Sequence, residues 1–409
     1  MVSRVDFSER RNNIRLNRRR IRPVRSMNPP AVQTIEAAMP KVGYIDYSLI
    51  FTIIVLCAFG LLMLFSTSSY NASLTMGDPT YYFRHQLIAT ALGAVVMIVT
   101  ALIPYGFWKK LYVPAYAVSV ISLLLVLTPL GIEKNGARRW IKVGGTSIQP
   151  AEIAKIGLII FLAALVCKLG RNLAIMKGKL IFLGVTLPVA GMLYLITDNL
   201  SSALIVFGIA LVMLFVATPD YKNFVLIGAL FAAVAAVIVY LIMNVESVAE
   251  AGFRFHRIQV WLNPEAYEKG FQTVQGLYAI GSGGILGKGL GQSMQKLGFV
   301  PEAQNDMIFS IICEELGLFG AFLVMVLFMV LIWRLFVIAN NAPDRFGAMI
   351  TVGVMAHIMI QVILNIAVVT NTIPNTGITL PFISYGGTSI LFLMAEMGLV
   401  MSVARRINA

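Results

Sequence analysis

Hydrophobic residues run along this chain in long blocks that polar residues rarely interrupt. Most blocks approach the twenty or so residues that a helix needs to cross a bilayer, and none alternates with period two as a barrel strand does. We therefore predict an all-α polytopic membrane protein with ten transmembrane helices. The predicted helices cover residues 46–66, 86–105, 110–130, 151–168, 179–197, 200–217, 223–244, 307–335, 346–370 and 387–404.

Composition agrees with this pattern. The chain is 58% hydrophobic and 12% charged, and the charged share is about half of that in an ordinary soluble domain. Its three cysteines, Cys57, Cys167 and Cys313, all lie inside hydrophobic blocks. They are expected to be small buried side chains, and they indicate no disulfide framework.

Basic residues are concentrated at the N-terminus, where residues 1–45 contain nine arginines. The tail lacks the interleaved aromatic residues of a nucleic-acid-binding arm, so no nucleic-acid partner is expected. We interpret residues 1–45 as a disordered cytoplasmic tail on the anionic membrane face, and residues 46–406 as the ten-helix membrane domain.

The distribution of Lys and Arg also predicts an orientation in the bacterial cytoplasmic membrane. With both termini in the cytoplasm, most basic residues lie on the inner side, as expected for a membrane protein. Three extracytoplasmic loops then cover residues 131–150, 245–306 and 371–386, the second of them between predicted helices 7 and 8. The last loop is uncharged and rich in Pro and Gly, so we expect it to shape a substrate groove.

The first of these loops carries Arg138, Arg139 and Lys142, which the orientation rule does not favour there. Guanidinium groups match phosphate oxygens, so we expect an anion-binding site; pairing with lipid phosphates is the alternative. Glu152 and Lys155 follow on one face of a helix that begins near the membrane surface. Lys155 is a further anion-binding candidate and Glu152 a candidate second carboxylate, with a structural ion pair as the alternative.

Acidic residues mark the stretch FVPEAQNDMIFSIICEELG. Asp306 lies where the long loop meets the eighth predicted helix, and there it can act as a general base. Helical rotation places Glu314 about 80° from Asp306 and Glu315 on the opposite face. Glu302 and Glu314 are therefore candidate second carboxylates, whereas helix-to-helix hydrogen bonding is the alternative for Glu314 and Glu315.

Other polar residues give weaker signals. The glycine-rich part of the long loop carries Arg254, His256, Arg257, Lys288 and Lys296, which can contact a headgroup or be solvated at the surface. No His, Asp or Glu cluster has the spacing of metal ligands, so no protein-held metal is predicted.

Three stretches together resemble the SEDS family of cell-wall polymerases (shape, elongation, division and sporulation proteins). They are NGARRWIKVGGTSIQPAEIAK, GSGGILGKGLGQSMQKLGFVPEAQNDMIFSIICEELG and NTGITLPFISYGGTS. The resemblance extends over residues 44–406, and DPTYYFRHQL together with the basic tail fits the division and sporulation branch. It implies a peptidoglycan glycosyltransferase that polymerises lipid II beside a class B penicillin-binding transpeptidase and other division proteins, at the division septum.

The resemblance also implies roles for individual residues. The family's catalytic aspartate falls on Asp306, and its basic loop on Arg138, Arg139 and Lys155. This chain has Gln304 and Asn305 where many members have His and Thr, so those two positions are not expected to carry protons.

The implied reaction is an inverting glycosyl transfer. Asp306 removes the proton from a sugar hydroxyl, and that hydroxyl attacks the anomeric carbon of a polyprenyl-pyrophosphate donor. Arg138, Arg139, Lys142 or a divalent cation (Mg²⁺ or Mn²⁺) then stabilises the leaving pyrophosphate.

Two other functions stay open at this stage. A lipid II flippase would need a charged path through the membrane, and its candidates, Glu314, Glu315, Glu396 and Asn365, are scattered along the sequence. A non-catalytic scaffold of the division machinery would need no base at Asp306.

Overall fold

A computed structural model describes residues 45–134, 136–144, 146–218 and 253–407, together with scattered positions between 222 and 240. The predicted tail, apart from Ile45, lies outside these residues, as do most of the predicted helix 223–244 and the first part of the predicted loop 245–306.

Helices dominate the described residues, which confirms the predicted helical membrane class. Seven of them are long and apolar enough to cross a bilayer, and each coincides with a predicted segment. They are α1 (Tyr47–Met76), α2 (Tyr81–Leu102), α5 (Pro150–Leu169), α6 (Met176–Leu195), α7 (Leu200–Ala217), α12 (Ile308–Asn340) and α13 (Arg345–Val369). Two further predicted segments correspond to shorter helices. Helix α4 (Tyr112–Leu124) follows the short helix α3 (Tyr105–Lys110), and α14 (Ser389–Ala404) follows the last loop.

Several helix starts follow from local chemistry. The Asp46 side chain accepts a hydrogen bond from the Leu49 N–H at 2.9 Å and caps α1, and Asp344 caps α13 in the same way. Asn199 caps α7, and Pro150 occupies the first turn of α5, where its missing N–H costs nothing.

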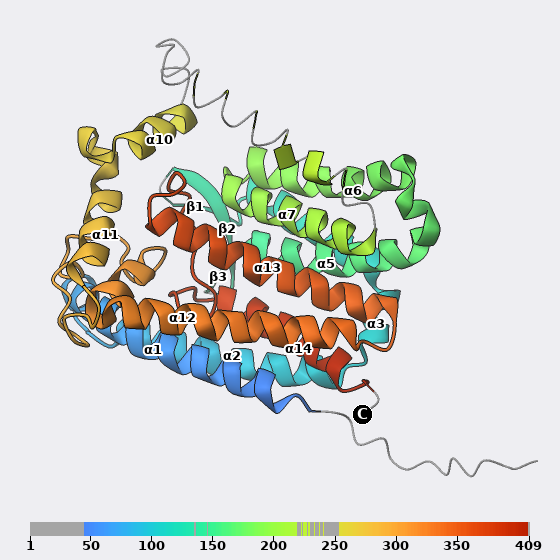
Figure 1. Cartoon of the computed structure of the whole chain (residues 1–409), viewed down its shortest axis with the longest axis horizontal. Helices are drawn as coiled ribbons and strands as arrows, with labels where there is room; N and C mark the ends of the chain where they lie inside the picture. Colours follow the sequence, from blue (N-terminus) through green and yellow to red (C-terminus); the bar gives the residue numbers. More distant parts are fainter. Residues whose placement is uncertain are drawn as a thin grey trace, which may run out of the picture. The chain divides into compact units, whose positions relative to one another are not determined.

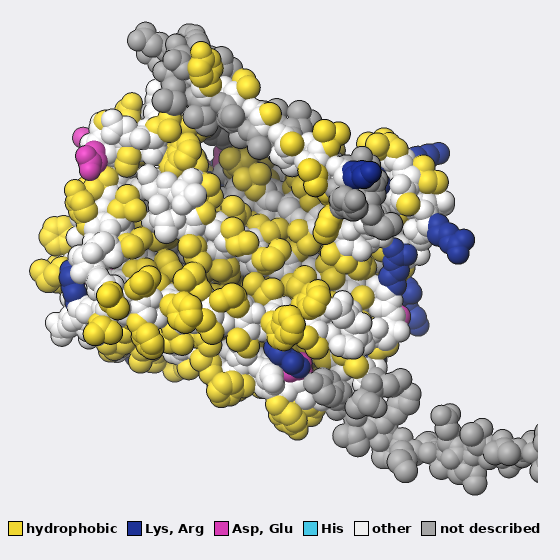
Figure 2. Space-filling model, viewed as in Figure 1, with side chains coloured by type: hydrophobic (Ala, Val, Ile, Leu, Met, Phe, Trp, Pro, Cys, Tyr) yellow, Lys and Arg dark blue, Asp and Glu magenta, His cyan; other side chains and the backbone are white. Residues whose placement is uncertain are grey.

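Helix α13 lies in the middle of the bundle and packs against α5, α7, α12 and α14 (Figure 1). Helix α14 packs on α2, while α1 packs between α2 and α12. Hydrophobic side chains cover much of the visible surface, and Lys and Arg side chains gather toward one end of it (Figure 2). A surface of this kind is expected where lipid, rather than water, surrounds the helices.

Residues 131–150 differ from the expected irregular loop, because they form a small antiparallel sheet. Strands β1 (Gly131–Lys134), β2 (Ala137–Val143) and β3 (Thr146–Ile148) pair in the order β1-β2-β3. Successive side chains of a strand point to opposite faces, and accordingly Ala137 and Ile141 are buried whereas Arg138 between them is exposed.

Residues 253–306 also contain more structure than predicted. Helix α10 (Phe253–Leu262), two short 3₁₀ turns and helix α11 (Phe271–Ser282) precede a series of turns that leads into α12. The uncharged stretch after α13 has no helix until α14, but side chains hold its backbone in place. Asn365 donates to the Ile378 carbonyl at 2.6 Å, and Ser201 donates to the Thr376 carbonyl at 2.7 Å.

Candidate functional site

Asp306 lies two residues before α12 and is held by two other elements. Its backbone carbonyl accepts a hydrogen bond from Asn365 of α13 at 2.9 Å. Its carboxylate accepts one from Gln272 of α11 at 3.4 Å, and Gln272 in turn accepts from Asn375 at 3.2 Å. The residue is 8% exposed. These amide contacts fix the carboxylate in position without neutralising it.

The environment makes this carboxyl group unusually basic. Burial raises the pKa of Asp306 from its ordinary value of 3.8 to about 7, and the negative charge of Glu302 adds to the effect. The backbone N–H groups of Asp306 and Met307 and the Gln272 side chain act in the opposite direction, because they stabilise the charged form. A carboxylate with a pKa near neutrality can take a proton from a substrate and release it again.

A cavity of about 270 Å³ opens beside this carboxylate. Cationic side chains reach it from three different segments: Arg139 from β2, Arg257 from α10 and Lys269 from the turn before α11. Its other polar lining comes from amides and hydroxyls, namely Gln272, Thr273, Asn371, Asn375 and Thr376. The cavity therefore combines one basic carboxylate with several cations, as a reaction that deprotonates a hydroxyl and releases an anion requires.

Of the basic residues predicted in the first loop, only Arg139 lines this cavity. Its guanidinium donates to the carbonyls of Thr197 and Asp198, at 3.2 and 2.8 Å, and burial lowers its pKa. Arg138 instead points to the other side of β2, is half exposed and pairs with Glu133 at 3.5 Å. Lys142 is exposed as well. The expectation that all three share one site is wrong, because strand alternation separates neighbouring residues.

Lys155 and Glu152 also lie apart from the cavity. They form a buried ion pair at 2.8 Å, and the Lys155 Nζ lies 2.9 Å from Nε2 of His357. Nδ1 of the same imidazole lies 2.8 Å from Glu396 of α14. The structure thus favours the structural alternative for this pair and joins α5, α13 and α14 through one polar chain. Glu396, which the sequence placed among the scattered candidates for a charged path, is thereby joined to Lys155 through His357.

With Lys155 as an ammonium, hydrogen-bond chemistry assigns the ring proton of His357. An ammonium group donates only, so Nε2 of His357 must accept, and the ring proton lies on Nδ1, where it donates to Glu396. The imidazole is then neutral, and the two carboxylates face a single ammonium. His357 and Glu396 are at most 1% exposed. Loss of Lys155 would therefore leave negative charge uncompensated in the bundle.

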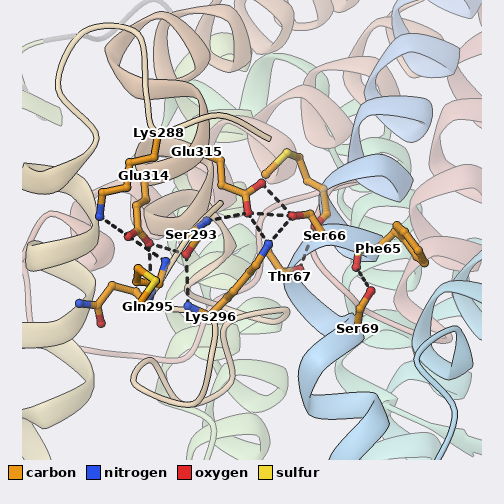
Figure 3. A network of polar contacts seen from close by, with 12 residues as sticks. Phe65, Ser66, Thr67, Ser69, Lys288, Ser293, Gln295, Lys296, Glu314 and Glu315 are labelled. Atoms are coloured by element: carbon orange, nitrogen blue, oxygen red, sulfur yellow. Dashed lines mark hydrogen bonds and ion pairs between the residues drawn. The ribbon is translucent and has the colours of Figure 1, made fainter. Parts of the chain in front are cut away.

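Glu314, another candidate second carboxylate, and its neighbour Glu315 have other partners (Figure 3). Glu314 accepts hydrogen bonds from Lys288 at 2.7 Å and from Ser293, and Glu315 accepts from Lys296 at 2.7 Å. Both glutamates are fully buried and neither lines the cavity. Lys288 and Lys296 are accordingly ion-pair partners rather than solvated residues.

Glu302 acts on Asp306 only from a distance. It is exposed and accepts a hydrogen bond from the Asn305 side chain. Its backbone adopts a positive φ of 53°, which is uncommon outside glycine. Like Glu314 and Glu152, it does not line the cavity, although its charge helps to raise the Asp306 pKa.

Several cavity residues gave no signal in the sequence. Gln272, Trp261 and Lys269 lie in a region predicted as loop, and an uncharged Gln or Trp in a loop has no distinctive spacing. Trp261 donates its indole N–H to the Asn371 carbonyl at 2.9 Å, and Asn371 donates back to the Trp261 carbonyl. Only contacts between distant segments identify these residues.

The cavity does not offer a ligand set for a divalent cation. Asp306 is the one carboxylate among its described lining residues. Across the described residues no group of three or more His, Cys, Asp or Glu side chains has the arrangement to hold a metal ion. Mg²⁺ and Mn²⁺ prefer several oxygen ligands, and the described lining offers a single carboxylate.

Seven long apolar helices and a polar cavity near the start of α12 define a polytopic membrane protein with its candidate site at the helix ends. The family of FtsW, RodA and SpoVE, described as "Cell cycle protein", matches residues 47–409. This chain belongs to that family, the SEDS family.

Relatives and solved structures agree. The chain is 37% identical to "Stage V sporulation protein E" of Bacillus subtilis, over 88% of this chain and 97% of that protein. It is 35% identical to "Probable peptidoglycan glycosyltransferase FtsW" of Trichlorobacter lovleyi, over 88% of this chain and 93% of that protein.

Among solved structures, one chain of "Structural coordination of polymerization and crosslinking by a peptidoglycan synthase complex" superposes with a TM-score of 0.73. It is 29% identical, over 88% of this chain and 98% of that one. The "Rod shape determining protein RodA" of Thermus thermophilus gives a TM-score of 0.64 at 27% identity, over 89% of this chain and 98% of that one.

Proposed function

We propose that this protein is a peptidoglycan glycosyltransferase that polymerises lipid II at the outer face of the bacterial cytoplasmic membrane. The names of its FtsW relatives support the reaction class. The observation that carries the proposal is the Asp306 carboxylate, which has a pKa of about 7 and lines one cavity with Arg139, Arg257 and Lys269. Such a site supplies both a base and a receptor for a pyrophosphate.

In this reaction Asp306 takes the proton of the acceptor's GlcNAc 4-hydroxyl. The hydroxyl oxygen attacks the anomeric carbon of the donor sugar while the bond from that carbon to the pyrophosphate oxygen breaks, so the configuration inverts. Arg139, Arg257 and Lys269 balance the charge that grows on the leaving pyrophosphate. Asp306 then returns its proton to water.

Gln272 and Asn365 act as positioning residues in this proposal. They hold the Asp306 side chain and backbone through contacts of 3.4 and 2.9 Å. A base must lie within hydrogen-bond reach of the proton that it removes, and fixed geometry raises the share of productive encounters.

The proposal includes an orientation and partners. The Asp306 end of the bundle faces outward and both termini face the cytoplasm. The relative from the peptidoglycan synthase complex supports a crosslinking partner, which we take to be a class B penicillin-binding transpeptidase. We expect the protein to work with it at the division septum.

A lipid II flippase is the second candidate, and one observation favours it. The polar chain Glu152–Lys155–His357–Glu396 places ionisable groups inside the bundle. Intramembrane charges often mark a transport path. Against this, His357 and Glu396 are at most 1% exposed and do not line the cavity.

The deciding experiment is polymerisation of labelled lipid II by the purified protein in liposomes, with and without the partner transpeptidase. Wild-type protein should yield glycan chains, and Asp306→Asn should yield none. Glu265→Gln, at an exposed acid outside the cavity, is the matched control and should be active. Glycan synthesis by the Asp306 variant would remove its role as base. Transbilayer movement of lipid II without polymerisation would favour the flippase, and neither activity would favour a scaffold.

A further inference from the structure

Two groups of polar contacts, called ties below, join α1 to α12. The two ties lie about one membrane thickness apart along the helices. At one end Arg334 pairs with Asp46 at 2.6 Å. At the other, Ser66 donates to Glu315 at 2.8 Å, and Lys296 pairs with the same carboxylate. About twenty residues separate the two ties along each helix, which at 1.5 Å per residue is roughly 30 Å.

No charged residue lies between the two ties on either helix. The thickness of a bilayer's hydrocarbon core is also about 30 Å. The level of Glu315 therefore marks the edge of the hydrocarbon on the side of Asp306.

The segment between α11 and α12, residues 283–300, reaches below this edge. Lys288 and Gly289 donate their N–H groups to the carbonyls of Glu314 and Glu315, both at 2.9 Å. One turn deeper along α12, the N–H groups of Leu318 and Phe319 donate to the carbonyls of Gly284 and Ile285. Phe319 lies four residues past Glu315, which is about 6 Å further along the helix.

Two glycines permit this close approach. Gly317 has a positive φ of 66° inside α12, and a Cβ there would lie 2.3 Å from the backbone nitrogen of Gly287. A Cβ on Gly287 would meet the Glu315 carbonyl at 2.2 Å. The segment is thus joined to the kinked helix backbone to backbone.

The charged side chains of the segment are paired, and most of its exposed side chains are apolar. Lys288 and Lys296 are paired with Glu314 and Glu315 (Figure 3). Leu286 is 81% exposed and Ile285 73%, and Leu290, Met294 and Phe299 are exposed too. Backbone outside a helix is tolerated at hydrocarbon depth where it is buried in protein, and this segment is joined to α12 by four backbone hydrogen bonds. Leu318 and Phe319 of α12, bonded to this segment, are also exposed.

We propose that residues 283–300 form a re-entrant segment that dips into the leaflet on the Asp306 side, with Ile285 and Leu286 against the acyl chains of bulk phospholipid. This differs from the extracytoplasmic loop that the sequence predicts. The segment directly follows α11, whose first turn carries Gln272, the side chain that contacts Asp306. The bilayer therefore holds one end of the helix whose other end positions the candidate base.

Spin labels report this immersion independently of any enzymatic activity. Cysteine is introduced at Leu286 in the full chain with Cys167→Ala, since Cys57 and Cys313 are buried. The protein is placed in phosphatidylcholine nanodiscs, and collisions with oxygen, which enters hydrocarbon, are compared with collisions with a polar nickel chelate, which does not. Leu318→Cys on α12 is the lipid reference and Glu265→Cys the aqueous reference, both being exposed positions.

Immersion predicts that oxygen collisions exceed nickel collisions at Leu286, as at Leu318 and opposite to Glu265. A second label at Leu290, also exposed, guards against a local effect of the first substitution. Nickel collisions in excess at both positions would mean that the segment lies in water. Exclusion of both reagents would mean that protein covers it. Either result overturns the proposal.

Discussion

Replacing Asp306 by asparagine should make the folded protein more stable at neutral and alkaline pH. Asparagine keeps the shape of the side chain and can still accept hydrogen bonds from Gln272 and from the nearby backbone N–H groups. It removes the buried charge and replaces one acceptor oxygen by an NH₂ group. Because the same variant should be inactive, stability and activity would change in opposite directions.

The size and sign follow from the pKa of Asp306, which rises from 3.8 to about 7 on folding. Between these values the folded state binds more protons than the unfolded state, so the free energy of unfolding falls as the pH rises. Each pH unit of the difference corresponds to about 1.36 kcal/mol, which gives a full cost of about 4 kcal/mol above pH 7. About 2 kcal/mol of this cost develops between pH 5 and pH 7.

The assay is thermal unfolding of both proteins in the same detergent at pH 5, 7 and 8. The variant's advantage in Tm should grow from pH 5 to pH 7 and then level off. Glu265→Gln removes an exposed acid and should show no such trend. An advantage that shrinks with rising pH would refute a buried carboxyl of raised pKa at Asp306, and so would one that is independent of pH.

Other substitutions test the rest of the site. Glu302→Gln removes a charge that raises the pKa of Asp306, so that pKa should fall. In a pH–rate profile, the increase in polymerisation rate that accompanies deprotonation of Asp306 should then occur at lower pH than in the wild type. Arg139→Ala should lower kcat/KM for lipid II by at least about tenfold, as for loss of one transition-state donor, whereas the neighbouring Arg138→Ala should change it little. Lys155→Met should lower the free energy of unfolding by about 3–5 kcal/mol, because it leaves the buried Glu152 carboxylate without its ion-pair partner, and thermal unfolding would measure this.

The helices were predictable because their signal is local. A long apolar block reports its own membrane span, and caps such as Asp46 and Asp344 lie next to the helices they begin. The small sheet was not predictable in the same way. Its strands are only three to seven residues long, and a glycine-containing turn interrupts the alternation that would reveal them. The different directions of Arg138 and Arg139 follow from that missed alternation.

The candidate base was predictable, but its surroundings were not. Asp306 stands out as an acid at the start of an apolar block, whereas Gln272 and Asn365 contact it from 34 and 59 residues away. The partners of Glu314 and Glu315 come from an upstream segment whose path no local pattern reveals. Helical rotation distinguished Glu314 from Glu315, but in the structure neither lines the cavity, because Lys288 pairs with Glu314 and Lys296 with Glu315.

The proposed role of Asp306 as a base depends on how near the cations of the cavity come to its carboxylate. A cation within ion-pair distance would lower the pKa and leave a weak base, whereas deeper burial without hydrogen bonds would keep the group protonated. Among the described residues no Lys or Arg pairs with this carboxylate; an amide and backbone N–H groups contact it instead. Arg139, Arg257 and Lys269 line the same cavity without neutralising it. In the proposed reaction these cations would face the leaving pyrophosphate, while the carboxylate keeps a pKa of about 7, at which it can accept a proton.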